Sequence, residues 1–367
     1  MFPRRPRLRV AGVSLVVLLL LPGGATAFAR DRISTVAVFP VENLTGSSIP
    51  ADSIRQFLIE RLTTDRINVL GSEALDDFMT RHRVRYTAGI DAATAESMRQ
   101  EVGVDGVVIA SVELSSGAVP PKVAIVLRLV SIQASPVVVW ADDAGVAGDD
   151  APGLLELGVV DDYRTLQTRV LNRMTQALVA YLKTEDVKTD LRHASKFRPK
   201  SSYRHITVEP GKTYSVAVLP LFNLSERRNA GEILALLFMR HLSGFRQFRV
   251  IDTGVARRQL LDARIIMEGG LSLSDAELVA TLIEADFILA GRVLHYQDYE
   301  GPAGTTRVEF STVLIEKKSR RVVWSSNSYN DGDDGVSFFE RGTSRTAHVM
   351  ATQMVRLATE MIAGSNH

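Results

Sequence analysis

Val36–Thr45 reads VAVFPVENLT, and Val216–Ser225 reads VAVLPLFNLS. Each stretch is a valine-rich apolar run that a proline interrupts, followed by an Asn-Leu-Thr or Asn-Leu-Ser segment. Short runs rich in valine are typical of buried β-strands, because β-branched side chains pack well on a pleated surface. The same ten-residue pattern returns after 180 residues, which indicates an internal repeat.

Three further pairs of blocks occur in the same order and at almost the same spacing. The blocks are Ile67–Leu70 with Phe248–Ile251, Asp105–Ala110 with Asp286–Gly291, and Val138–Trp140 with Val322–Trp324. The last pair contains both tryptophans of the chain. Four matching blocks in one order predict two tandem copies of a single domain.

Each predicted copy contains the same succession of elements. An amphipathic helix follows the first strand, with Ile54, Leu58 and Leu62 on one face of the first copy. Alternating residues at Lys122–Ile132 and Thr305–Glu316 predict the first strand of a hairpin, whose second strand ends near the tryptophan. Closing helices are expected at 163–182 and 337–362. The order is βαβαββα, so we predict an α/β fold in which helices pack on a mixed sheet.

These patterns divide the chain into four segments. Residues 1–29 are predicted to be a signal peptide, 30–185 the first domain, and 213–367 the second domain. Residues 186–212 between them are rich in Lys and Arg and are interrupted by Pro, Ser and Gly. This composition predicts a basic linker, either a solvated spacer or a contact for anionic lipid or a glycan polymer.

The first segment has the features of an export signal. Four arginines precede an apolar run at Val10–Leu21, and small residues at Ala25–Ala29 offer cleavage sites after Ala27 or Ala29. The run is shorter than the about 20 residues that a membrane-spanning helix needs. We therefore expect a processed periplasmic protein without a transmembrane span, which resides in the periplasm or at the periphery of the outer membrane.

Composition excludes several classes of protein. The chain has no cysteine, which excludes disulfides, thiolate metal sites and a lipidated N-terminal cysteine. Loss of the four signal arginines leaves 39 basic residues against 42 acidic ones. A mildly acidic chain has no overall field that attracts nucleic acid, so no nucleic-acid partner is expected.

The repeated blocks resemble the TolB N-terminal-like superfamily, which is related to the curli secretion subunit CsgG and to penicillin-binding-protein activators. The resemblance is carried by Val36–Thr45, Val216–Ser225, Ala285–Gly291 and the two tryptophan blocks. It covers most of the mature chain. It implies a periplasmic or outer-membrane-associated protein that binds partners and has no catalytic residues.

The chain also departs from these families. It has neither the lipidated cysteine common among CsgG-like and activator proteins nor a β-propeller repeat. A CsgG-type pore needs long strand insertions, whereas about eight residues around Ser115–Pro121 separate the third and fourth strands of the first copy. Barrel strands need about ten residues each, so the sequence does not predict a pore.

Four loop residues are the candidate partner or ligand contacts. Asn43 and Thr45 follow the first strand of the first copy, and Asn223 and Ser225 occupy the same places in the second. One interpretation is a pair of ligand-facing loops at the carboxyl ends of strands. The other is a turn in which the asparagine side chain bonds to its own backbone.

The remaining polar residues predict structural roles. Asp105 and Asp286 each precede a strand, as expected of turn residues. Acidic turns are expected after the last strand of each copy, with Asp142, Asp143, Asp149 and Asp150 in the first and 330–334 in the second. No pair among the seven histidines has zinc-helix spacing, and no nucleotide-binding or nucleophile motif occurs. The sequence predicts no enzyme, cofactor or metal.

Three functions follow from these observations. The first is a partner-binding or scaffold component of an envelope assembly or secretion system, with an envelope or outer-membrane protein as its partner. The second is a periplasmic receptor that holds a small ligand between the two domains. The third is a hydrolase whose site is assembled only in space. The sequence does not specify the oligomeric state.

Overall fold

The computed structural model describes residues 33–150, 159–184, 197–206, 208–209, 211–265, 279, 282–298, 305–332 and 346–364. The predicted signal peptide at 1–29, the first part of the predicted linker and the acidic residues 333–334 lie outside this set. Residues 33–367 cluster into one compact unit. We call 33–184 the N-terminal half and 197–364 the C-terminal half.

The N-terminal half begins with a buried strand and closes with a long helix. Its elements are β1 (Thr35–Val38), β2 (Glu42–Asn43), α1 (Ala51–Thr64), β3 (Asn68–Val69), α2 (Ser72–Arg81), α3 (Ala92–Val102), β4 (Gly106–Ser116), β5 (Lys122–Ser131), β6 (Val137–Ala147) and α4 (Tyr163–Thr184). Asp91 caps α3 by accepting from the backbone nitrogens of Ala93 and Thr94, and Gly103 ends the helix with a left-handed conformation.

The C-terminal half has nearly the same order of elements. They are β7 (Ser201–Arg204), β8 (Tyr214–Val218), β9 (Phe222–Asn223), α5 (Ala230–Ser243), β10 (Phe248–Ile251), α6 (Thr253–Asp262), β11 (Phe287–Gln297), β12 (Arg307–Glu316), β13 (Arg321–Asp331) and α8 (Ala347–Ala363). The capping box predicted at 274–277 lies outside the described residues. The last helix begins at Ala347, ten residues later than predicted, and Thr346 caps it by accepting from the Val349 nitrogen.

The strands form a single mixed sheet, which confirms the predicted α/β class. The N-terminal half contributes the order β3-β1-β4-β5-β6, and the C-terminal half contributes β10-β8-β11-β12-β13. In both halves the first three strands of that order are parallel to one another. The fourth strand pairs antiparallel with the third, and the fifth antiparallel with the fourth. The halves are joined where β6 pairs antiparallel with β10, through Val138 with Val250 and Val137 with Ile251.

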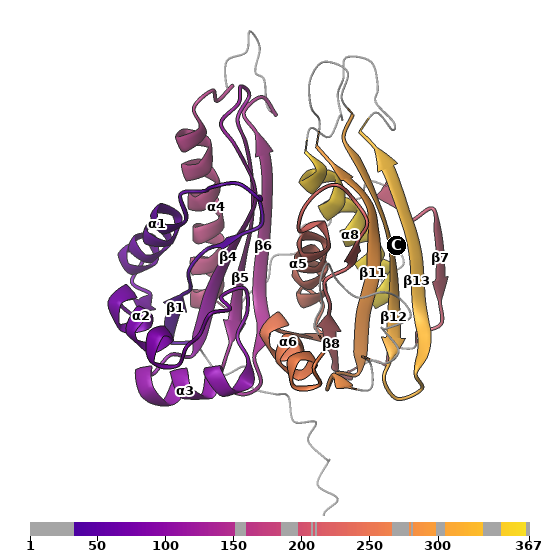
Figure 1. The fold of residues 1–367 in the computed structure, drawn as a ribbon, viewed down its shortest axis with the longest axis horizontal. Helices are drawn as coiled ribbons and strands as arrows, with labels where there is room; N and C mark the ends of the chain where they lie inside the picture. Colours follow the sequence, from indigo (N-terminus) through magenta and orange to yellow (C-terminus); the bar gives the residue numbers. More distant parts are fainter. Residues whose placement is uncertain are drawn as a thin grey trace, which may run out of the picture. The chain divides into compact units, whose positions relative to one another are not determined.

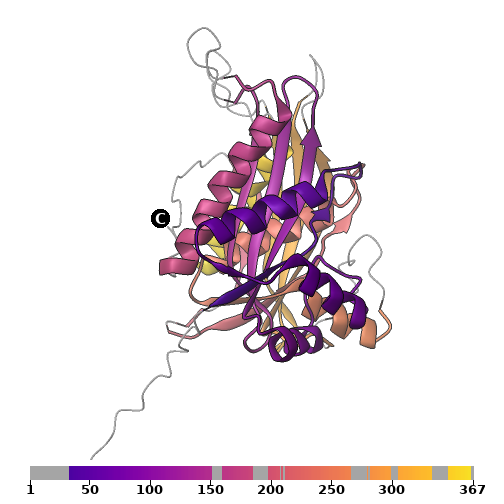
Figure 2. The same ribbon diagram turned by 90° about the vertical axis from the view of Figure 1, so that its left-hand side faces the viewer.

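The helices of the C-terminal half lie between two parts of the sheet (Figure 1). Helix α4 packs on β5 and β6, and α1 packs on α4 and β1; Figure 2 shows both helices crossing the strands of the N-terminal half. Helices α5 and α8 contact β6 on one side and their own strands β11 to β13 on the other. A second sheet surface therefore covers α5 and α8, whereas none covers α1.

The first helix of each half, α1 or α5, is buried to an extent that reflects whether a second sheet surface covers it. In α1 only Ile54, Leu58 and Leu62 are buried, on one face. In α5 eleven of the fourteen residues are buried, among them Phe238 and Met239. A helix that is apolar all round is stable only when it is enclosed, so the sequence of α5 is explained by its place between two sheet surfaces. One hydrophobic core accordingly includes Phe39 and Val107 of the N-terminal half together with Phe238 of the C-terminal half.

Two predictions about strand ends were wrong. Both last strands continue seven residues beyond the tryptophan, β6 to Ala147 and β13 to Asp331. Asp142 and Asp143 therefore lie within a strand, and so do Asn330 and Asp331; of the predicted acidic turn residues in the N-terminal half only Asp149 and Asp150 follow the strand. Asp142 and Asp143 are accommodated in the strand because cationic side chains, among them Arg240 and His348, pair with their carboxylates.

The predicted linker also contains structure that composition did not reveal. Ser201–Arg204 forms β7, which pairs antiparallel with β13 and ends the sheet. All four of its residues are exposed, so no apolar pattern marked it as a strand. Asp105 and Asp286 have a structural role, but it is not confined to a local turn: each carboxylate accepts backbone hydrogen bonds at the start of the paired strand, from Ser34 and Thr35 in one half and from Ser215 in the other.

Candidate functional site

The structure places Asn43 and Thr45 in a closed turn after β2. The Asn43 Oδ1 accepts from the Thr45 backbone nitrogen at 3.0 Å and from its hydroxyl at 2.8 Å. The Asn43 amide nitrogen donates to the Ser47 carbonyl at 2.6 Å. These bonds use the polar groups of the side chain inside the turn, which favours the turn interpretation.

Asn223 and Ser225 repeat this geometry after β9. The Asn223 Oδ1 accepts from the Ser225 nitrogen and hydroxyl, and its amide donates to the Arg227 carbonyl. The two turns are also brought together, because Arg227 donates to the Thr45 carbonyl at 3.4 Å and Asn229 to the Leu44 carbonyl at 3.2 Å. The two turns thus meet at one contact between the halves, while the side chains of Asn43, Asn223 and Ser225 bond within their own turns.

We expect Asn43→Ala to lower the free energy of unfolding by about 1 kcal/mol, since it removes hydrogen bonds of a partly exposed turn. Partner recovery should not change, because the Asn43 side chain bonds within its turn. Urea denaturation and a pull-down with the same tagged variant measure both quantities. A loss of partner with unchanged stability would restore the ligand-loop interpretation.

A buried charged cluster joins the two halves at the level of α8. His348 of α8 places Nδ1 2.7 Å from a Glu113 carboxylate oxygen and Nε2 3.0 Å from an Asp143 oxygen. The Tyr296 hydroxyl donates to the other Glu113 oxygen at 2.5 Å. Arg240 of α5 lies 2.7 Å from Asp143. His348 and Glu113 are only 1% and 2% exposed, so each charge depends on its partners.

The cluster shifts the titration of its members. Burial disfavours the imidazolium of His348, but the charge of Glu113 and the hydrogen bond to Asp143 outweigh it and raise the His348 pKa to about 10. Burial likewise opposes ionisation of Asp143, yet the hydrogen bond from His348 and the charge of Arg240 hold its pKa well below the usual range. The arrangement is therefore an imidazolium between two carboxylates, which connects the halves.

A second buried ion pair connects the halves near α6. Arg128 of β5 lies 3.8 Å from Asp252, and both are almost fully buried. Asp252 also caps α6 and accepts from the Ile90 nitrogen at 2.7 Å. The Arg128 guanidinium donates to the Ser111 hydroxyl and to the Ala88 carbonyl. Asp252 thus contacts the N-terminal half through the Ile90 nitrogen and the Arg128 charge, while the facing Arg128 Nε and Asp252 Oδ2 atoms make no hydrogen bond to any described residue.

Gly145 of β6 allows the close approach of α8. A Cβ atom at this position would lie 2.6 Å from the His348 Cδ2 and 3.0 Å from its Cβ. Such a distance is too short for a real contact, so any larger residue displaces the histidine.

We expect Gly145→Ala to cost about 1–3 kcal/mol of unfolding free energy, the usual cost of overpacking. Gly117→Ala in the β4–β5 turn is the matched control, because a Cβ atom at Gly117 would have no neighbour within 4 Å. Thermal melting of both variants measures the difference. Equal melting temperatures would mean that α8 is not seated against Gly145.

The corresponding sheet face of the C-terminal half is only partly covered within the described residues: α6 packs near Ile288, Ala290 and Ile315, whereas the part around Arg292, Ser311 and Asn327 lines a groove. Strand β5 is buried at eight consecutive positions, from Val123 to Val130, whereas in β12 outward residues such as Arg307, Glu309 and Val313 are partly exposed. Alternation of this kind is typical of a sheet with one face toward solvent. Beside the edge strand β7 this face forms a polar groove.

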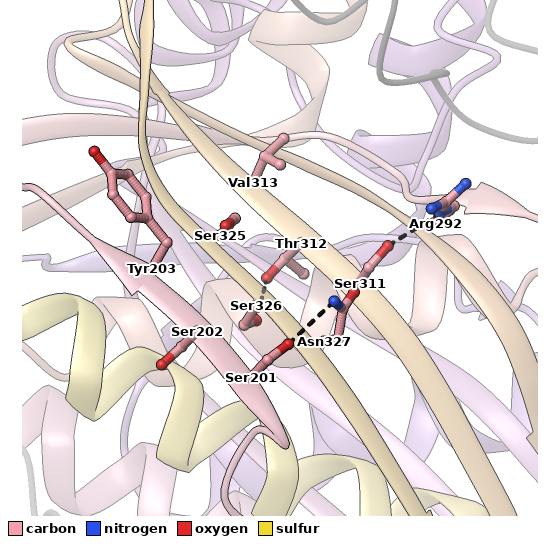
Figure 3. Close-up of a pocket in the computed structure, with 10 residues that line it drawn as sticks. All are labelled: Ser201, Ser202, Tyr203, Arg292, Ser311, Thr312, Val313, Ser325, Ser326 and Asn327. Carbon is pink, nitrogen blue, oxygen red and sulfur yellow. Dashed lines mark hydrogen bonds between the residues drawn. The ribbon is translucent and has the colours of Figure 1, made fainter.

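The groove has a volume of about 310 Å³ and a floor of hydroxyl groups, with Arg292 at one side and Tyr203 at the other (Figure 3). Its lining residues are Ser201, Ser202, Tyr203, Arg292, Ser311, Thr312, Val313, Ser325, Ser326 and Asn327. Arg292 donates to the Ser311 hydroxyl at 3.2 Å, and the Asn327 amide donates to Ser201 at 3.2 Å. One aliphatic side chain among ten makes this a polar recognition surface, unlike the mostly apolar lining of small-molecule pockets.

Within the described ranges, no three His, Cys, Asp or Glu side chains are placed to hold a metal ion. Over the same residues, no helix has the length and hydropathy of a membrane span.

No protein-family profile and no curated protein matches this sequence. Solved structures with a similar fold include the PelC dodecamer from Paraburkholderia phytofirmans (19% identity, TM-score 0.30, 43% of this chain and 92% of that one). Others are lipoprotein GNA1162 from Neisseria meningitidis (17%, TM-score 0.29, 40% and 99%) and the LpoB C-terminal domain from Salmonella enterica (17%, TM-score 0.27, 32% and 86%). Each aligns with less than half of the present chain.

Proposed function

We propose that this chain is an exported, non-enzymatic envelope protein that binds a protein partner as part of an assembly or secretion system. The observation that carries the proposal is the open polar face of β11 to β13. The same face of β4 to β6 in the N-terminal half is filled by α5 and α8. A polar sheet surface that is exposed among the described residues, at the place where the other half binds two helices, is suited to a partner.

Placement in the envelope is supported by the predicted signal at 1–29. We also propose that both halves belong to the TolB N-terminal-like superfamily, on the strength of the repeated sequence blocks. The protein would act in the periplasm or at the periphery of the outer membrane.

The geometry favours this function over a small-ligand receptor. A receptor of that kind needs opposed, water-accessible surfaces between its domains. Here the opposed surfaces carry Glu113, His348 and Asp252, each at most 2% exposed and each bonded across the junction. A ligand there would have to break buried ion pairs.

A crosslinked pull-down from intact cells with a C-terminally tagged chain tests the proposal. We expect one envelope protein in stoichiometric yield. A monomer that recovers no partner, in cells where the chain is exported and folded, would contradict the binding function.

A further inference from the structure

We call the face of β4 to β6 that α5 and α8 cover the filled face, and the corresponding face of β11 to β13 the open face. The pairing of the strands relates each position on the filled face to one on the open face. Ser111 pairs with Val126 and Val126 with Asp143 across β4, β5 and β6. Arg292 pairs with Ser311 and Ser311 with Asn327 across β11, β12 and β13. Because the strand orders agree, Arg292 takes the place of Ser111, and Asn327 that of Asp143.

Around α5 and α8 the filled face is acidic, and these two helices bring cations, whereas near α6 the sheet residue Arg128 pairs with Asp252. Asp143 binds Arg240 of α5 and His348 of α8, and Glu113 binds His348 from the other side. Carboxylates on the sheet and cations on the helices therefore define how α5 and α8 are recognised.

The open face differs in charge from the filled face at the equivalent positions, and its one acidic residue on β12, Glu309, is paired with Arg307 and His295. The neutral Asn327 stands in the place of Asp143, and the cationic Arg292 in the place of Ser111. Glu42 pairs with Ser111 and Phe222 pairs with Arg292, so Phe222 takes the place of Glu42. Arg292 is exposed, and only its Nε is engaged within the described part of the chain, with Ser311. The terminal nitrogens of the Arg292 guanidinium thus remain available to donate hydrogen bonds. A guanidinium binds a carboxylate through two such bonds at once.

A second copy of this chain could present α4, the equivalent of α8, or α1, the equivalent of α5. The outer surface of α4 carries the exposed Arg164, Arg169 and Arg173, whereas α1 has the exposed Asp52 and Glu60. No acidic residue occurs anywhere in α4. Arginines of α4 would face Arg292, and like charges across an interface oppose association.

We propose that the open face docks a helix of a partner protein that presents an acidic side chain to Arg292, in the place that α5 and α8 occupy on the N-terminal half. This inference rests on the proposed partner-binding function. It specifies the face, the contacting element and the sign of its charge.

Photocrosslinking in cells tests the inference. Ser325→p-benzoylphenylalanine places a crosslinker in the groove, and Thr168→p-benzoylphenylalanine on the exposed side of α4 is the control. The crosslinked peptide, identified by mass spectrometry, should come from a helical segment that contains Asp or Glu. Arg292→Glu should reduce the yield at least about tenfold, as for a desolvated interface charge, while Arg292→Lys, which keeps the charge but loses the bidentate geometry, should reduce it less. Arg321→Glu, at an exposed position of β13, should have no effect.

Reversal of the partner's acidic residue to Arg should restore crosslinking to the Arg292→Glu chain, whose unchanged melting temperature would confirm its fold. Crosslinks to a glycan, to a second copy of this chain, or to a protein with no dependence on Arg292 would overturn the inference. A partner that crosslinks only from the α4 position would overturn it while leaving the partner-binding function intact.

Discussion

His348→Leu is expected to lower the free energy of unfolding by about 3–5 kcal/mol, because it leaves two carboxylates buried without their shared cation. Glu113 and Asp143 both depend on this imidazole, at 2.7 and 3.0 Å. Urea denaturation of the full chain measures the loss. His295→Leu is the control: His295 is a half-exposed strand residue that lies 3.7 Å from Glu309, and its loss should cost at most about 1 kcal/mol. Equal losses in the two variants would contradict a buried ionic junction.

The same cluster predicts a pH dependence with a defined sign. The His348 pKa is raised from 6.5 to about 10, so its stabilising contribution is complete below about pH 6.5 and is lost as the pH rises through 10. The difference in stability between the parent chain and His348→Gln should therefore shrink from pH 6 to pH 10. A constant or growing difference over this range would show that the imidazole is neutral in the folded protein.

Val218→Asp should abolish folding of the C-terminal half. Val218 is 1% exposed in β8 and pairs with Leu289 of β11. A buried unpaired carboxylate costs several kcal/mol even after its pKa shifts, against a total stability of about 5–15 kcal/mol for a typical folded protein. Because one core spans the junction, the N-terminal half should lose stability as well.

Circular dichroism melting of Val218→Asp measures this effect, with Val322→Asp at a 37% exposed position of β13 as the control. The free energy of unfolding of the control should lie within about 1 kcal/mol of that of the parent chain. A native-like transition in Val218→Asp would mean that β8 is not a core strand.

The sequence contained enough to predict the strands that form the core. The valine-rich runs at β1 and β8 and the tryptophan strands β6 and β13 were recognisable, because local periodicity records which side chains are buried. Helix α5 carried a further signal in its uninterrupted apolar residues, which indicate enclosure on every side.

The junction between the halves was not predictable from local pattern. Glu113 and His348 are 235 positions apart, and each alone resembles an isolated polar residue in a strand or helix. Strand β7 was missed because all its side chains are exposed. The open groove was missed because its residues converge only when β11, β12, β13 and β7 lie side by side.

Thiol labelling at one position on each of the two sheet faces tests the central claim most directly, since the parent chain has no cysteine. Ala124 of β5 is fully buried under the docked helices, and Asn327 of β13 is exposed in the groove. We predict that a cysteine-specific reagent modifies Asn327→Cys at nearly the rate of a free thiol, while Ala124→Cys reacts only through rare opening of the junction. Similar rates at both positions would contradict the account of one filled face and one open face.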